Sequence, residues 1–246
     1  MNYHWNWRIF FELSPDAQGT YLDMLLAGAR WTIATALVSF VLALLLGSLI
    51  GVMRTLPTPR WARGVAQIYV EVLRNIPLLV QMFLWYFVLP ELLPKAWGTW
   101  LKQLSNAPFV TAVVCLGFFT SARIAEQVRA GLGSLPRGQT QAATALGLST
   151  RQAYTHVLLP QAYRIILPTL TSEFLNNLKN TSVGLTIGLV ELTAAARAMQ
   201  EFSFQVFEAF SAATLIYLAI NLVATALARL LERRYPAPGA LLQPAH

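Results

Sequence analysis

Long apolar runs separated by short basic segments dominate this sequence. The clearest run covers residues 31–53, which include no charged residue and would rise roughly 35 Å as a helix, enough to cross a bilayer. Four weaker runs cover residues 64–89, 108–130, 165–190 and 207–230. Apolar runs of about 20 residues are typical of transmembrane helices. The pattern therefore predicts an all-α polytopic membrane protein with about five transmembrane helices.

The composition agrees with a bilayer as the solvent. Of the 246 residues, 56% are hydrophobic and only 12% are charged, whereas about 25% are charged in an average soluble domain. The formal net charge of +7 comes largely from arginines in short segments beside apolar runs. This distribution indicates cytoplasmic loops, because nucleic-acid binding would need one basic stripe interleaved with stacking aromatic residues.

The arginines also predict an orientation. Arg54, Arg60 and Arg63 follow the first apolar run, and Arg233 and Arg234 follow the last one. Short basic segments next to membrane helices lie on the cytoplasmic side. Five spans then place the N-terminus outside and the C-terminus in the cytoplasm, with the chain in the bacterial inner (cytoplasmic) membrane as a multi-pass protein.

Three regions are expected along the chain. Residues 1–20 would form an interfacial segment, because aromatic residues such as Trp5 and Trp7 favour the membrane surface. Residues 21–232 would form the transmembrane domain. Residues 233–246, rich in Pro and Ala, would form a loose C-terminal tail.

Charged and proline residues inside the runs give more local expectations. Glu71 and Arg74 lie three residues apart, as do Arg123 and Glu126, so each pair shares a helix face and predicts an ion pair. Pro77 should kink the second run. The fourth run is rich in polar residues, and its helix is expected to break near 180–184.

The longest polar stretch follows the third run and predicts a helix-turn-helix. Residues 139–146 are rich in Ala and Gln and favour a helix, which Gly147 should interrupt. Ser149 should cap a second short helix over residues 150–157. Pro160 should end that helix and set the angle of the next span.

The same stretch has a recognisable spacing. Gln141-Ala142-Ala143 is followed after three residues by Gly147, and after nine more by Val157-Leu158-Leu159-Pro160. This resembles the EAA loop of ABC-importer permeases: Glu-Ala-Ala, three residues, Gly, nine residues, Ile, any residue, Leu-Pro. Gln141 replaces the usual Glu and removes a charge that would favour a helix start. An ordinary cytoplasmic helix hairpin is the alternative interpretation.

The resemblance implies a type I ABC-importer transmembrane domain in which residues 139–160 form the cytoplasmic EAA coupling loop. This loop would bind a partner ATPase. The residues implied for docking are Gln141, Ala142, Ala143, Gly147, Leu159 and Pro160.

Two more segments are similar to permeases of polar amino acids, the histidine/glutamine/glutamate group. One runs from Glu71 to Gln81, with Asn75-Ile76 at the position where the group usually has Gly-Thr. The other is Leu178-Lys179-Asn180-Thr181-Ser182. As a whole, residues 21–232 look most similar to a glutamate/aspartate importer permease.

This resemblance implies an activity and partners. The chain would move a polar amino acid across the inner membrane into the cytoplasm, and glutamate and aspartate are the favoured substrates. ATP and Mg would be used by separate ATP-binding-cassette ATPase subunits. A second similar permease subunit, in a homodimer or heterodimer, and a periplasmic amino-acid-binding protein would complete the importer.

Polar residues at membrane depth form the predicted substrate path. Such residues rarely face lipid, because an unpaired polar group in hydrocarbon costs several kcal/mol by order of magnitude. The residues concerned are Arg74, Asn75 and Gln81 in the second run and Asn176, Asn177, Lys179 and Asn180 in the fourth. Two alternatives stay open: Arg74 snorkels at the interface, and Lys179 pairs with Glu173 or with a helix C-terminus.

No enzyme motif is present. The sequence has no Gly-rich phosphate loop with Gly-Lys-Ser/Thr, no Gly-x-Ser-x-Gly and no His-Glu-x-x-His. Its single cysteine, Cys115, lies in an apolar run. We therefore expect no catalytic residue, no metal site and no cofactor in this chain. The competing transporter class, an ion-gradient-driven secondary amino-acid carrier, predicts an inverted hydropathy repeat, and none is visible.

The expected orientation can be tested by thiol labelling. In a Cys115→Ala background, Lys95→Cys should react with a membrane-impermeant reagent in intact spheroplasts, because it lies in an external connection. Arg151→Cys should react only after the membrane has been opened. Reaction of position 151 from outside would overturn the topology.

Overall fold

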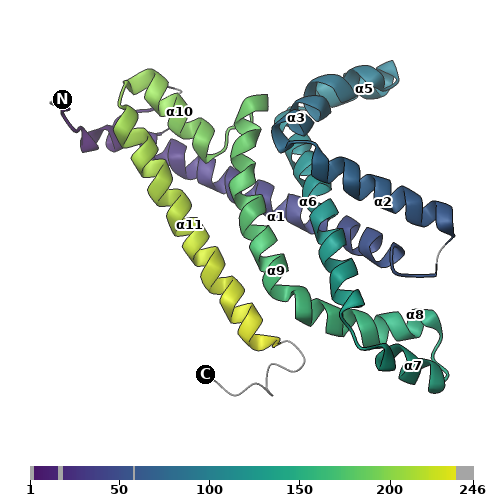
Figure 1. Cartoon of the computed structure of the whole chain (residues 1–246). Helices are drawn as coiled ribbons and strands as arrows, with labels where there is room; N and C mark the ends of the chain where they lie inside the picture. The colour runs from purple at the N-terminus through teal and green to yellow at the C-terminus, as the bar shows by residue number, and fades with distance from the viewer. Residues whose placement is uncertain (1–2, 16–18, 58, 237–246) are drawn as a thin grey trace. The chain divides into compact units, whose positions relative to one another are not determined.

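The fold is known from a computed structural model, which describes residues 3–15, 19–57 and 59–236 (Figure 1). Its regular elements in these ranges are helices. The α-helices are α1 (Tyr21–Met53), α2 (Arg60–Asn75), α3 (Leu78–Phe83), α4 (Leu89–Leu92), α5 (Lys95–Gln103), α6 (Ala107–Gly133), α7 (Arg137–Ala145), α8 (Thr150–Gln152), α9 (Leu159–Asn180), α10 (Leu192–Ser203) and α11 (Val206–Arg234).

Several of these helices have the length and hydropathy of membrane spans. Three of them, α1, α6 and α11, are long and apolar enough to cross a membrane alone. Two more spans result if each broken helix pair is counted as one, namely α2 with the helices in 78–92, and the helical run 150–187 with α10. The described residues thus contain up to five candidate spans, which agrees with the predicted number.

The ends of the first and last spans differ from the expected boundaries. Helix α1 begins at Tyr21, ten residues before the apolar run, because Thr20 and Asp23 cap it: the Thr20 N–H donates to Asp23 Oδ2 (2.9 Å) and the Asp23 N–H to Thr20 Oγ1 (3.2 Å). Helix α11 continues to Arg234. Residues 233 and 234, expected in the loose tail, therefore belong to α11, and residues from 237 onward lie outside the described ones.

Both predicted irregularities are present. Helix α2 ends at Asn75 and α3 begins directly after Pro77, so the proline breaks the helix instead of only kinking it. Helix α9 ends at Asn180 and passes into a 3₁₀ helix, η4 (Thr181–Ile187), which confirms the break near 180–184.

The chain forms two compact units, each described here by itself. The first unit contains Met1–Val41, Ile76–Gly117 and Asn176–Val223, and the second contains Leu42–Asn75, Phe118–Leu175 and Ala224–His246. One apolar core of the first unit packs the start of α1 against α10 and α11. In the second unit, α6 contacts α1, α2 and α9, and the loop that holds α7 and α8 joins α6 to α9 (Figure 1).

Small residues form a continuous buried face along α1. They recur every three or four residues and are Gly28, Thr32, Ala36, Ser39, Ala43, Gly47 and Gly51. In the second unit, a Cβ at Gly47 would lie 2.7 Å from Ile124 Cβ, and a Cβ at Gly51 would lie 2.7 Å from the Ala125 carbonyl oxygen. Helix α1 therefore packs directly against the backbone of α6, as helices with small residues at this spacing do in membranes.

The close approach of α1 and α6 predicts opposite effects on stability for alanine substitutions at Gly51 and Gly64. Gly51→Ala should lower stability by roughly 1–3 kcal/mol, because the new methyl group overpacks the α1–α6 contact. Gly64→Ala in α2 is the matched control, since no atom lies within 4 Å of a Cβ built there. It should be neutral or stabilise by up to about 1 kcal/mol through helix propensity. Thermal unfolding of the two purified variants in detergent measures the difference, and equal melting temperatures would contradict the packing.

Candidate functional site

The turn in the loop between α6 and α9 has a defined backbone geometry. Gly147 has φ +75°, and the Gly147 N–H donates to the Thr144 carbonyl (2.9 Å) while the Leu148 N–H donates to the Ala143 carbonyl (3.1 Å). These two bonds form a Schellman motif that ends α7. A Cβ at Gly147 would have no neighbour within 4 Å. Glycine is therefore required here by the left-handed backbone and not by lack of space.

The second half of the turn starts with a capping box. Ser149 Oγ accepts from the Gln152 N–H (3.3 Å), and Gln152 Oε1 accepts from the Ser149 N–H (2.9 Å). The cap predicted at Ser149 is confirmed. The predicted interruption at Gly147 is confirmed as well, so the loop has the expected helix-turn-helix form.

The role expected for Pro160 is wrong. Helix α8 passes through a π-helical turn, Ala153–Leu158, directly into α9, and Pro160 is the second residue of α9. A proline ring clashes with the carbonyl four residues earlier in a regular α-helix. The wider π turn changes the carbonyl positions just before the proline, so the helix continues through it.

The residues implied for docking differ in exposure. Gln141, Ala142, Gly147 and Pro160 are exposed and Leu159 is half-buried, whereas only 3% of Ala143 is exposed. Gln141 lies in the second turn of α7, which begins at Arg137, so its missing charge is not at the helix start.

Leu146 is an exposed apolar residue that the sequence interpretation missed. It precedes the turn glycine, and 80% of its surface is exposed. The sequence could have indicated this exposed residue, because Leu146 is an apolar residue at the end of a predicted helix in an otherwise polar stretch. The opposite end of the loop is held in place, because Gln161 Nε2 donates to Gln139 Oε1 (2.8 Å).

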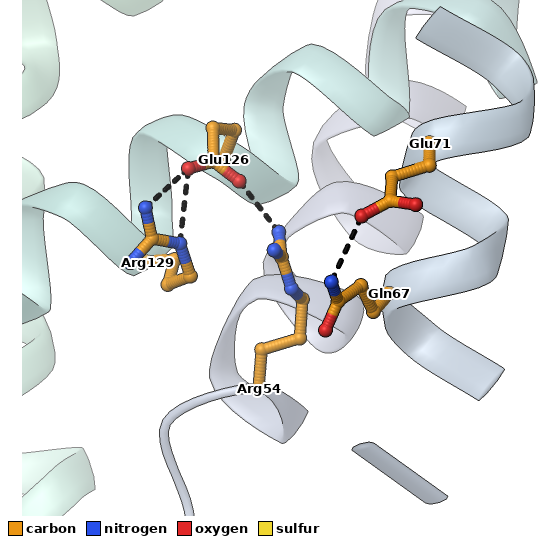
Figure 2. Close-up of polar contacts among 5 residues, drawn as sticks. All are labelled: Arg54, Gln67, Glu71, Glu126 and Arg129. Atoms are coloured by element: carbon orange, nitrogen blue, oxygen red, sulfur yellow. Dashed lines mark hydrogen bonds and ion pairs between the residues drawn. The ribbon is translucent and has the colours of Figure 1, made fainter. Parts of the chain in front are cut away.

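A network of charged side chains joins two helices of the second unit (Figure 2). Arg54, after the end of α1, donates to Glu126 of α6 at 2.6 Å, and Glu126 also pairs with Arg129 one turn later. Glu71 accepts from Gln67 at 2.8 Å instead. Arg54 is thus the residue of this group that ties one helix to another.

Both ion pairs predicted from helical spacing are therefore wrong. Glu71 is bonded to Gln67 and not to Arg74. Arg123 lies 4.0 Å from Glu173 and 4.9 Å from the Phe119 ring centroid. Spacing along one helix shows which residues can meet, but a partner from a neighbouring helix can be nearer.

The predicted substrate-path residues divide into two groups. Arg74 and Asn75 belong to the second unit and lie exposed at the end of α2. Gln81, Asn176, Asn177, Lys179 and Asn180 belong to the first unit. Of these, Lys179 is exposed, and Asn176 and Asn180 are half-buried.

Two of the seven residues are buried and bonded within the fold. Gln81 Nε2 donates to the Ile76 carbonyl at 2.9 Å. Asn177 Nδ2 donates to Ser39 Oγ (2.8 Å) and to the Ala36 carbonyl (3.0 Å), which ties the end of α9 to α1. These contacts give both amides a structural role that the sequence did not reveal.

The two cations predicted for the path form no ion pair among the described residues. Among the described residues, the side chains of Lys179 and Arg74 have no hydrogen-bond or ion-pair partner. Glu173, the alternative partner considered for Lys179, faces Arg123.

A buried carboxylate in the first unit was also missed. Glu191 is fully buried and caps the N-terminus of α10, accepting the N–H groups of Thr193 (3.0 Å) and Ala194 (2.9 Å). It also accepts the Tyr217 hydroxyl at 2.7 Å. An acidic residue directly before an Ala-rich helix was the only signal in the sequence, since such a side chain can cap a helix.

Two transport permease proteins are similar to most of the chain. Glutamate/aspartate import permease protein GltJ of Escherichia coli (strain K12) is 45% identical over 242 residues, which cover 97% of this chain and 98% of that protein. Glutamine transport system permease protein GlnP of Escherichia coli (strain K12) is 34% identical, covering 87% and 93%.

Solved structures of ABC transporters are also similar to this chain. An amino acid ABC transporter crystallised with histidines matches at a TM-score of 0.74 and 31% identity, covering 87% of this chain and 95% of that chain. The MetNI methionine ABC transporter, in an inward facing conformation, matches at a TM-score of 0.65. That second likeness is only 18% identical and supports the fold alone.

A family comparison completes the assignment. The family described as "Binding-protein-dependent transport system inner membrane component" matches residues 43–236, most of the chain. The chain therefore belongs to this family of inner-membrane transport components, as the permease resemblance in its sequence predicts.

Proposed function

We propose that this chain is the permease subunit of an ATP-binding-cassette importer that carries glutamate and aspartate into the cytoplasm. The 45% identity to GltJ over 97% of the chain is the observation that supports the substrate. GlnP is less similar, at 34% identity. A secondary carrier has no support, because the matching family is one of binding-protein-dependent transport.

The proposed importer contains a binding protein, ATPases and two permeases, which form a homodimer or a heterodimer. A periplasmic amino-acid-binding protein delivers the cargo, this chain pairs with a second permease, and ATPase subunits bind the EAA loops. ATP and Mg are used by the ATPases, and this chain carries no cofactor. The transmembrane domain spans residues 21–232, with the N-terminus outside and the C-terminus in the cytoplasm. Closure of the ATPases moves the loops, and the permeases rock between outward-open and inward-open states.

The docking role of the loop rests on its shape and on Leu146. The Schellman turn and the capping box hold α7 and α8 in a fixed protrusion, and Leu146 stands exposed at its turn. An exposed leucine on a rigid turn fits an apolar pocket of a partner protein.

Substitutions of Gly147 test this role. Gly147→Val should reduce co-purification of the ATPase by roughly tenfold or more, because a β-branched residue is strained by about 1–3 kcal/mol at positive φ. Gly147→Asn should keep most of the binding, since Asn tolerates this conformation. Gly133→Val is the matched control, because its added Cβ meets nothing within 4 Å and its φ is ordinary. Normal ATPase binding by Gly147→Val would contradict the docking assignment.

The acidic cargo is tested through Lys179 and Arg74. Lys179→Ala and Arg74→Ala should each weaken glutamate and aspartate uptake by about tenfold or more while the complex still assembles, since each removes a charge-assisted hydrogen bond to a carboxylate. The matched control is Arg197→Ala, an exposed cation paired with Glu201 at 2.8 Å. Radiolabelled uptake in membrane vesicles gives the measurement. Uptake at the wild-type rate by both variants would contradict a role of Lys179 and Arg74 in the substrate path.

A further inference from the structure

The segment between α9 and α10 is irregular in conformation but firmly packed. Thr181 is fully buried, and only 3% of Ile187 and 4% of Leu189 are exposed. Ile187 and Leu189 lie in an apolar cluster with Met82 of α3 and Leu116 of α6. Non-helical backbone at membrane depth is tolerated where protein surrounds it. This segment therefore is held by its neighbours at Thr181, Ile187 and Leu189, although Val190 is exposed.

The start of the segment is fastened to α1 by an amide. Asn177 is 1% exposed, and its Nδ2 donates to Ser39 Oγ (2.8 Å) and the Ala36 carbonyl (3.0 Å). Both bonds come from one NH₂ group, so they fix its direction as well as its position. Lys179 lies two residues further along, in the last turn of α9.

The end of the segment is fastened to the same helix at Thr32, by the Leu192 backbone amide and, in a longer bond, by the Glu191 carboxylate. Thr32 Oγ1 of α1 accepts the Leu192 N–H at 3.1 Å and lies 3.4 Å from Glu191 Oε2. The Tyr217 hydroxyl of α11 donates to the same carboxylate oxygen. At Gly28, a Cβ would lie 2.9 Å from Leu192 Cα, so α1 contacts the backbone where α10 begins.

The two attachments lie on one face of α1, two turns apart. Thr32 and Ser39 are both fully buried members of its small-residue face. A buried hydrogen bond has little net effect on stability, but leaving its donor or acceptor unpaired is costly, so such bonds select one arrangement. Apolar side chains at positions 177 and 191 would fill space without selecting one arrangement of the backbone between them.

We propose that Asn177 and Glu191 are positioning residues for import: by fastening both ends of residues 178–191 to α1, they fix the place and direction of Lys179. Neither residue touches the cargo. This inference rests on the role of Lys179 given under the proposed function. In this proposal, the buried Asn177 and Glu191 contribute to transport only through the position of Lys179.

The attachment itself is tested without transport. The assembled importer in lipid nanodiscs would be compared as wild type, Glu191→Gln and Thr32→Val by hydrogen–deuterium exchange. Both variants should exchange about tenfold faster in peptides covering residues 181–190, because each loses a buried hydrogen-bond partner. The matched control is Glu208→Gln, an equally buried carboxylate of the same unit that is bonded to Tyr3 and to the Asn6 N–H. Unchanged exchange in both variants would overturn the attachment.

The link to Lys179 is tested by a double-mutant cycle on uptake. Glu191→Gln and Lys179→Ala should each raise the KM for glutamate, and the double variant should be little worse than Lys179→Ala alone, because both act through one side chain. Multiplied effects would show that Glu191 acts independently of Lys179 and would overturn the link. A wild-type complex that imports neither glutamate nor aspartate would refute the proposed cargo, while the exchange experiment would still decide the attachment.

Discussion

The close packing of α1 against its neighbours is the constraint on which the other contacts depend. A face of Gly, Ala, Ser and Thr brings other backbones within contact distance, as the 2.7 Å approaches at Gly47 and Gly51 show. Between membrane helices there is little hydrophobic driving force, so dispersion contacts and hydrogen bonds have to hold the bundle. Short separations make both possible. Larger residues on this face would move α6 away from α1 and Arg54 away from Glu126.

Polar groups within the candidate spans serve two different purposes. Asn177 and Glu191 are buried, and each has several partners within one unit. Lys179 and Arg74 are exposed and have no partner among the described residues. Composition alone presents all four as polar residues in or directly beside apolar runs. Only their surroundings separate the buried, bonded groups from the exposed cations that we propose for the cargo path.

The features that could be predicted from the sequence are local ones. Gly147, Ser149 and the break after Asn180 follow from backbone preferences of a few neighbouring residues, and the structure has them where the pattern places them. The ion pairs could not be predicted, because the partner of Glu126 is Arg54, 72 residues away in the chain. The continuation of the helix through Pro160 depends on a π turn, which propensity rules do not anticipate.

The loop around Gly147 takes its shape from bonds within itself. Both the Schellman motif and the capping box join residues no more than five positions apart, so they need no second protein to form. A protrusion that is already ordered loses little conformational entropy when a partner binds it. It also bends little under load, so a displacement at its tip reaches α6 and α9 undiminished. Under the proposed docking role, a flexible loop of the same composition would absorb that displacement and would couple the ATPase to the permease poorly.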